Sequence, residues 1–109
     1  MKSKSNETAL VRSAVEWLNI VGVFAWRVNT GAAQYQDRHG KKRFVRFGAP
    51  GVSDIIGIMP DGRFLAAEAK VGDNTPTAAQ RHFLDMVNAA GGLGVVFHSI
   101  DELAEAIGA

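Results

Sequence analysis

Apolar residues recur at helical spacing near the start of the chain. One stripe carries Leu10, Ala14, Leu18 and Val21. This spacing matches the 3.6-residue period of an α-helix, and it predicts a helix over residues 7–21 with Asn6, or alternatively Ser5, as its N-cap. Residues 1–6 are polar and are expected to form a disordered tail. The same helical period returns at residues 78–90 and 99–107, where Thr77 and Ser99 are the expected N-caps.

Strand-like runs fill most of the remaining chain. Runs rich in β-branched and aromatic residues predict strands at residues 23–29, 44–47, 55–59, 63–70 and 94–97. Residues 31–43 are expected to be a polar loop. The order of elements predicts a single α/β domain, residues 7–109, with a mixed β-sheet flanked by helices. The last two strands enclose a helix and should form a parallel crossover unit.

A tight turn fixes the register of the two central strands. Pro60-Asp61-Gly62 suits a type I turn followed by a glycine at positive φ. Met59 then pairs with Arg63, and counting back along the ladder places Asp54 opposite Glu68. Lys70 is two residues beyond Glu68 and shares its strand face.

The facing acids suggest a cation site. Two like charges opposite each other destabilise a sheet unless a divalent cation or a proton compensates them. Carboxylate oxygens suit Mg²⁺ or Mn²⁺, and the Lys70 ammonium could stand beside a phosphate. These parts fit metal-assisted phosphodiester hydrolysis. An ordinary hairpin whose charges point into solvent is the alternative.

Two further polar residues lean toward the same region. Glu7 precedes Leu10 by three residues and Val11 by four, so it lies on the inward stripe of the first helix. It is either a third acid for the cation or an acid favoured by the helix dipole. Gln80, in the first turn of the second helix, either fixes Lys70 or is a polar residue at a helix start.

Basic residues are concentrated between positions 27 and 46. The segment contains one acid, Asp37, and six basic residues: Arg27, Arg38, Lys41, Lys42, Arg43 and Arg46. This local surplus predicts contact with a phosphate backbone, and a solvated loop is the equally plausible alternative. Asn29 shares a strand face with Arg27. The whole chain has a net charge of only +1.

The composition indicates a globular domain and excludes two kinds of cysteine site. The 109 residues are 47% hydrophobic and 21% charged, as in a globular domain. The absence of cysteine excludes disulfides and thiolate zinc sites. No apolar run reaches the length of a membrane span, and a cytoplasmic protein, of a bacterium or a phage-infected cell, is expected.

These features in order resemble one nuclease family. Asp54…Glu68-Ala69-Lys70 resembles the PD-(D/E)XK core, and the wider pattern resembles the stand-alone viral or phage type of the VRR-NUC branch. That pattern comprises Glu7, Arg27-Val28-Asn29-Thr30-Gly31, Gly51-Val52-Ser53-Asp54, Glu68-Ala69-Lys70, Gln80 and Gly91-Gly92. Ser53 departs from it, since many members have proline before the aspartate.

The resemblance implies a restriction-endonuclease-like fold and Mg²⁺- or Mn²⁺-dependent DNA hydrolysis. It also implies a homodimer acting on branched DNA such as Holliday junctions. Asp54, Glu68 and the Ala69 carbonyl would hold the metal, with Glu7 holding a water or a second ion. Lys70 would orient the attacking water, and Gln80 would support Lys70. The rival interpretation is a non-catalytic nucleic-acid-binding module, and DNA is not distinguished from RNA.

Overall fold

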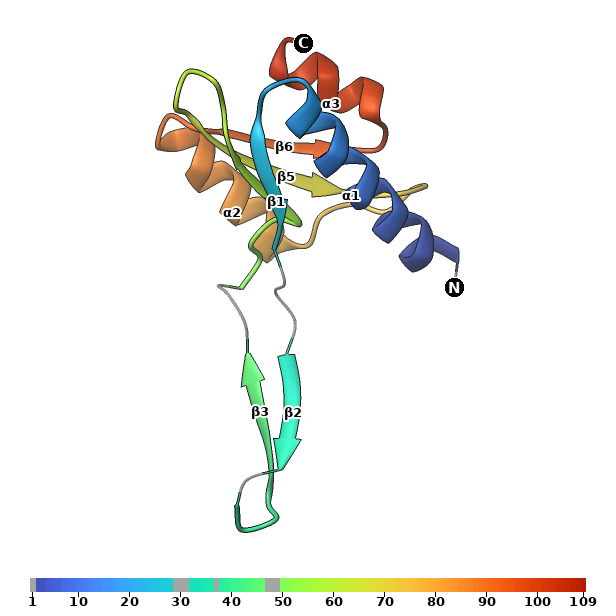
Figure 1. Cartoon of the computed structure of the whole chain (residues 1–109), viewed down its shortest axis with the longest axis vertical. Coiled ribbons are helices and arrows are strands. Elements are labelled where there is room, and N and C mark those ends of the chain that lie inside the picture. The colour runs from blue at the N-terminus through green and yellow to red at the C-terminus, as the bar shows by residue number, and fades with distance from the viewer. Residues whose placement is uncertain (1, 29–31, 37, 47–49) are drawn as a thin grey trace.

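The computed structural model describes residues 2–28, 32–36, 38–46 and 50–109. Its elements are α1 (Lys2–Ile20), β1 (Phe24–Arg27), β2 (Ala32–Gln36), β3 (Lys42–Arg46), β4 (Ile55–Ile58), β5 (Phe64–Ala69), α2 (Ala78–Ala89), β6 (Leu93–Phe97) and α3 (Ile100–Ile107). Figure 1 shows a body of helices around a sheet, from which a hairpin projects. The expected α/β class with a mixed, helix-flanked sheet is confirmed.

The main sheet has the strand order β1-β4-β5-β6. As the sequence predicts, β4 pairs with β5 in antiparallel fashion and β5 pairs with β6 in parallel, with α2 as the crossover. β1 pairs with β4 in antiparallel fashion, which the sequence analysis does not predict. The helix N-caps predicted at Thr77 and Ser99 are also present. Because β4 and β5 are the central strands, the residues at their ends are held on both sides by neighbouring backbone.

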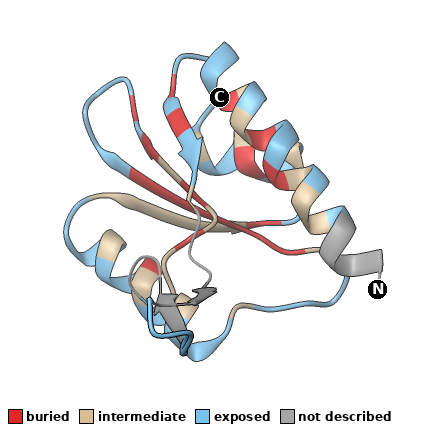
Figure 2. Ribbon diagram, turned by 60° about the horizontal axis from the view of Figure 1, so that its bottom comes forward, coloured by how far each residue is buried: buried red, intermediate tan, exposed pale blue. Residues whose placement is uncertain are grey.

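The core lies between the sheet and the two terminal helices. Val11, Ala14 and Leu18 of α1 pack with Leu103 of α3 and with alternate residues of the sheet: Ala25, Ile55, Leu65, Ala67, Ala69 and Phe97. Figure 2 shows these buried positions following α1 and the strands beneath it. Period-2 alternation turns Ala66 and Glu68 of β5 to the opposite face, against which α2 packs.

The predicted polar loop at residues 31–43 is wrong. Residues 32–36 form β2, which pairs with β3 from Ala32↔Arg46 to Gln36↔Lys42. The strand expected at residues 44–47 is accordingly β3, beginning at Lys42. Polar residues concealed the hairpin because a two-stranded ribbon away from the core has no face to bury, so it lacks the apolar alternation that marks a strand.

The first helix also begins earlier than predicted. α1 starts at Lys2, whereas the sequence favours a start near Glu7 after a tail. No glycine or proline interrupts residues 2–6, so nothing in this stretch forces the helix to stop, and Asn6 is not its cap. Within the described part of the chain, no helix is both long and apolar enough to span a membrane.

Candidate active site

The turn after β4 sets the geometry of the site. The Met59 amide donates to the Arg63 carbonyl and the Gly62 amide to the Met59 carbonyl, both at 2.8 Å, and Gly62 has a φ of 91°. This is the predicted turn with its glycine bulge. The ladder then runs from Ile58↔Phe64 to Ile55↔Ala67, so the next step brings Asp54 opposite Glu68. The predicted register is confirmed.

The two acids are held by each other's strands. The Asp54 amide donates to Glu68 Oε1 at 3.2 Å, and the Ala69 amide donates to Asp54 Oδ2 at 2.9 Å. The carboxylates therefore replace the backbone hydrogen bonds where the ladder between β4 and β5 ends. The two acids lie side by side at this end of the sheet, as the sequence predicts.

Lys70 completes a buried charged group. Its Nζ lies 3.4 Å from Glu68 Oε2, and only 1% of Glu68 and 9% of Lys70 are exposed. Burial, followed by the negative charge of Asp54, raises the pKa of Glu68 to about 7, although the Lys70 ammonium opposes the rise. A positive charge beside Asp54 would reverse much of this effect.

The Ala69 carbonyl offers a further oxygen at the same place. In a strand, the N–H and C=O of one residue point to the same side. The Lys70 amide donates to the Phe97 carbonyl on the β6 side, and the Ala69 amide donates to Asp54 on the β4 side. The Ala69 carbonyl consequently points toward Asp54.

These donors fit a hard divalent cation. Mg²⁺ is typically held by one or two carboxylates, with waters and substrate phosphate completing its shell, and two carboxylates and a carbonyl meet that need. Residues 2–28, 32–36, 38–46 and 50–109 contain no group of three or more His, Cys, Asp or Glu side chains that could hold a metal. Thus Asp54 and Glu68 do not form such a group with Glu7.

Glu7 instead lines a cleft next to Asp54. The cleft has a volume of about 180 Å³ and is lined by Glu7, Thr8, Val11, Arg27 and Asp54. The inward direction inferred for Glu7 is correct, but its place is across a cleft from Asp54 rather than in one ligand set. Sequence reasoning missed Thr8, whose proximity follows from its position directly after Glu7.

Gln80 has a different partner from the one expected. Its Oε1 accepts a hydrogen bond from the Thr77 amide at 2.8 Å, while Thr77 Oγ1 accepts from the Gln80 amide at 3.1 Å. This reciprocal capping box satisfies the start of α2, so the helix-start alternative accounts for the oxygen of Gln80. The Thr77-x-x-Gln80 spacing could have revealed this role in advance.

Gly51 joins the segment before Asp54 to the start of α2. A Cβ at Gly51 would lie 2.3 Å from the Ala79 carbonyl oxygen and 2.9 Å from the Gln80 amide nitrogen, and its φ is +77°. Only glycine fits this close approach. The sequence analysis does not predict that α2 makes this approach.

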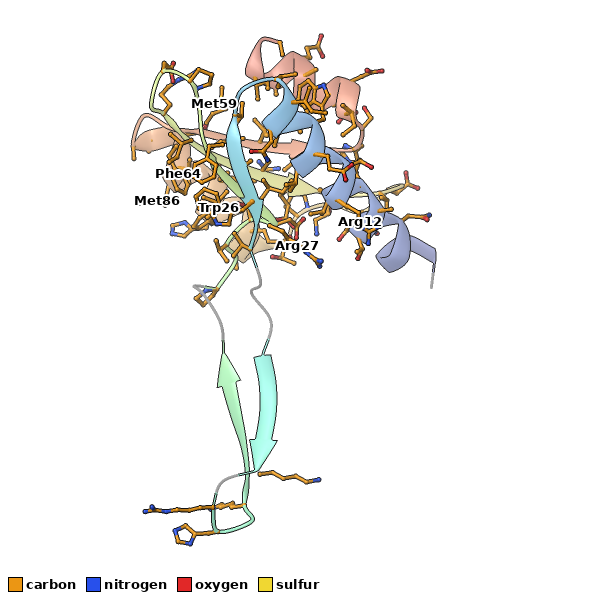
Figure 3. The ribbon with its side chains drawn as sticks, viewed as in Figure 1. Arg12, Trp26, Arg27, Met59, Phe64 and Met86 are labelled. Carbon is orange, nitrogen blue, oxygen red and sulfur yellow. The ribbon has the colours of Figure 1, made fainter. Side chains whose placement is uncertain are left out.

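The basic residues divide between two places. Arg27 is exposed at the end of β1 and borders the cleft, and Figure 3 shows it on the α1 side of β1, opposite Trp26. Arg38, Lys41 and Lys42 are exposed at the far end of the hairpin. Asn29 lies outside the described residues, and the side chains of Arg43 and Arg46 lie outside the described side chains.

A larger groove than this cleft lies elsewhere. It has a volume of about 410 Å³ and runs between the start of β5 and α2, where Phe64, Phe83, Met86 and Val87 line it. No carboxylate lines this groove, and Phe64 is at the opposite end of β5 from Ala69. It has no part in the chemistry of the acid pair.

Comparison of the chain with protein-family models and with curated proteins finds no match.

Proposed function

We propose that this protein is a metal-dependent DNA endonuclease that hydrolyses phosphodiester bonds. The observation that carries the proposal is the buried group of Asp54, Glu68 and Lys70, in which two carboxylates and an ammonium meet where the ladder between β4 and β5 ends. Burying like charges is costly, and a group of this kind indicates a function more often than it stabilises a fold. The ordered motif resemblance to the VRR-NUC branch of PD-(D/E)XK nucleases adds support.

The roles of the residues follow from their positions. Asp54, Glu68 and the Ala69 carbonyl would hold Mg²⁺ or Mn²⁺, which would supply positive charge for the phosphate oxygens and favour deprotonation of water. Lys70 is close enough to Glu68 to orient the attacking water and to stabilise charge that develops on the phosphate. Glu7, across the cleft from Asp54, would position a second water.

Arg27 would position the substrate. It is exposed at the edge of the cleft that contains Glu7 and Asp54, and a guanidinium can bind two phosphate oxygens at once. A phosphate held by Arg27 would neighbour the acid pair. Branched DNA such as a Holliday junction, cut by a homodimer, is the substrate class we propose from the resemblance.

One assay tests the activity. The purified protein is incubated with linear duplex, flap and four-way-junction DNA, with Mg²⁺, with Mn²⁺ and with EDTA. Cleavage with either metal and none in EDTA is expected, with the junction cut best. An RNA duplex of the same sequence tests whether the sugar matters.

A metal titration separates the nuclease from the non-catalytic module. Isothermal titration with Mn²⁺ should give saturable binding that Asp54→Asn abolishes. Asp85→Asn, an exposed acid on α2, is the matched control and should bind Mn²⁺ as the wild type does. Tight DNA binding without saturable Mn²⁺ binding would favour the non-catalytic module.

A further inference from the structure

The hairpin β2–β3 is a separate basic ribbon. Among the described elements, β2 and β3 make their contacts with each other and form their own two-stranded sheet. Residues 32–46 contain five basic residues and one acid, so they carry a net charge of +4, against +1 for the whole chain. The described turn residues 38–41 and the adjoining Lys42 are all exposed. The positive charge is thus concentrated on a part that the fold holds out from the body (Figure 1).

The topology fixes where this ribbon is attached. The hairpin is inserted between β1 and β4, which pair with each other up to Arg27↔Ile55, and the Val28 amide donates to the Asp54 carbonyl at 2.8 Å. The chain therefore leaves the body beside Arg27 and returns to it beside Asp54. Both roots of the ribbon lie next to the candidate active site.

The length of the arms limits how far the ribbon reaches. Arg38 is ten residue steps from Val28, and a fully extended chain of ten steps spans at most about 35 Å. One helical turn of DNA, 10–10.5 base pairs, is about 34–36 Å long. The turn of the hairpin can therefore reach DNA within about one helical turn of a phosphate held at Asp54.

We propose that the β2–β3 hairpin enters the major groove of duplex DNA within one helical turn of the scissile phosphate. The major groove is wide enough for a two-stranded β-ribbon, whereas the minor groove is about half as wide. Arg38 and Lys42, exposed at the end of the ribbon, contact the DNA there. The inference rests on the proposed function in that it takes DNA to be the ligand, and it adds that the enzyme requires a duplex arm.

Binding without chemistry tests the hairpin directly. Fluorescence anisotropy in EDTA measures the Kd of the whole protein for a 30-base-pair duplex between 50 and 200 mM salt. Arg38→Gln/Lys42→Gln should raise the Kd about tenfold and lower the slope of log Kd against log salt by about 1.8, because about 0.9 is lost per phosphate contact. Circular dichroism verifies that the variant is folded.

A matched pair of substitutions on the body is the control. Arg63→Gln/Arg81→Gln removes two exposed charges far from the hairpin in the sequence and should change the Kd less than twofold. If the hairpin pair also changes the Kd less than twofold, the inference is wrong.

Groove blocking tests the mode of contact. Duplexes whose cytosines carry bulky glucosyl groups in the major groove should bind the wild type as weakly as unmodified DNA binds the hairpin variant. Saturation with netropsin, which fills the minor groove, should leave the affinity unchanged. The opposite pattern, loss with netropsin alone, would overturn the assignment of the groove.

The length of the DNA duplex tests how far the hairpin reaches. Comparing binding with cleavage separates this inference from the proposed nuclease activity. Shortening a duplex arm below ten base pairs should remove the difference between wild type and hairpin variant. A wild type that shows the hairpin-dependent binding but cuts no DNA with Mn²⁺ would refute the nuclease and support the ribbon. A hairpin variant that binds and cuts long duplexes like the wild type would refute the ribbon and leave the nuclease supported.

Discussion

The acid pair at the end of the ladder between β4 and β5 lies next to the base of the β2–β3 hairpin. The two regions nevertheless differ in burial and in the contacts that hold their side chains. At the sheet, Asp54 and Glu68 are fixed by hydrogen bonds to backbone amides, and Glu68 and Lys70 are buried. On the hairpin, Arg38 and Lys42 are exposed, and β2 and β3 pair with each other in a sheet of their own. Neighbouring backbone therefore fixes the geometry of the acid pair, whereas the hairpin offers mainly positive charge at a distance from the body.

The difference matches two kinds of task. Hydrolysis needs groups positioned to within a fraction of an ångström, which only a packed frame provides. Contact with a phosphate backbone depends on the number of charges and falls with salt, so it tolerates an exposed ribbon. Substitutions at the sheet should therefore alter rate or folding, and substitutions on the hairpin should alter affinity.

The largest effect is expected from loss of the buried charges. Glu68→Ala and Lys70→Ala should each lower the cleavage rate at saturating Mg²⁺ by about 10³-fold or more, since the first removes a proposed metal ligand and the second the ammonium proposed to stabilise charge on the phosphate. DNA binding in EDTA should change less than threefold. Single-turnover kinetics on junction DNA measures the first quantity and anisotropy the second.

Exposed residues of the same charge serve as controls for this pair. Glu105→Ala on α3 and Arg81→Ala on α2 should cut like the wild type. Circular dichroism establishes that each variant is folded. Cleavage by folded Lys70→Ala at the wild-type rate would show that Lys70 has no catalytic role.

The next largest effect is on folding at the segment before Asp54. Gly51→Ala places a Cβ 2.3 Å from the Ala79 carbonyl oxygen at a φ of +77° and should lower the free energy of unfolding by about 3–5 kcal/mol. Gly108 has nearly the same φ, +78°, with no atom within 4 Å of its Cβ. Gly108→Ala should therefore cost only about 1–2 kcal/mol.

Urea denaturation compares the two glycine variants. A similar loss in both would mean that positive φ alone matters and that the contact between Gly51 and α2 is unimportant. A larger loss in Gly51→Ala, accompanied by loss of Mn²⁺ binding, would show that α2 holds the segment carrying Asp54.

A smaller effect concerns pH. Because the pKa of Glu68 is raised to about 7 in the folded state, the folded protein binds the proton more tightly than the unfolded chain, in which the pKa is near 4.5. The stabilisation is full below pH 4.5 and is lost as the pH rises through about 7, for a change of up to about 3 kcal/mol. Glu68→Gln should lack this contribution.

Comparing the wild type with Glu68→Gln isolates the contribution of Glu68 to the pH dependence of stability. Asp54 and Lys70 face position 68 in both proteins. Thermal unfolding is followed from pH 5 to pH 8 in EDTA. The wild type should lose stability relative to Glu68→Gln over this range. A difference between the two that is independent of pH would show that Glu68 is ionised throughout, held so by Lys70.

Local rules account for what the sequence predicted correctly. The turn at Pro60 fixes its own register through Gly62, and that register propagates by counting to Asp54 and Glu68. The caps at Thr77 and Ser99 are likewise local. The packing of α2 against Gly51 and the position of Glu7 across the cleft from Asp54 depend on contacts between segments that are far apart in the sequence. The hydrophobic periodicity of single elements does not encode such contacts.

The sequence analysis did not predict the hairpin, because the local pattern that identifies a strand is missing there. Its strands have no core to face, so the alternation by which strands are recognised is absent from residues 32–46. Charge singled out Lys42 and Arg38, and both are exposed, but the hairpin that presents them was not predicted. Charge density therefore singled out exposed positions of the hairpin, whereas the hydrophobic pattern failed to predict its strands.

The smallest effect should follow from the largest alteration of the chain. Replacing residues 30–48 with Gly-Ser-Gly removes the ribbon, yet the free energy of unfolding should change by about 1 kcal/mol or less. Among the described elements, β2 and β3 form a sheet of their own and make their extensive contacts with each other, and shortening a loop between paired strands slightly reduces the entropy cost of closing it. Mn²⁺ binding should persist while affinity for duplex DNA falls. A loss of more than about 2 kcal/mol in urea denaturation would mean that the ribbon packs on the body and that the two regions are not independent.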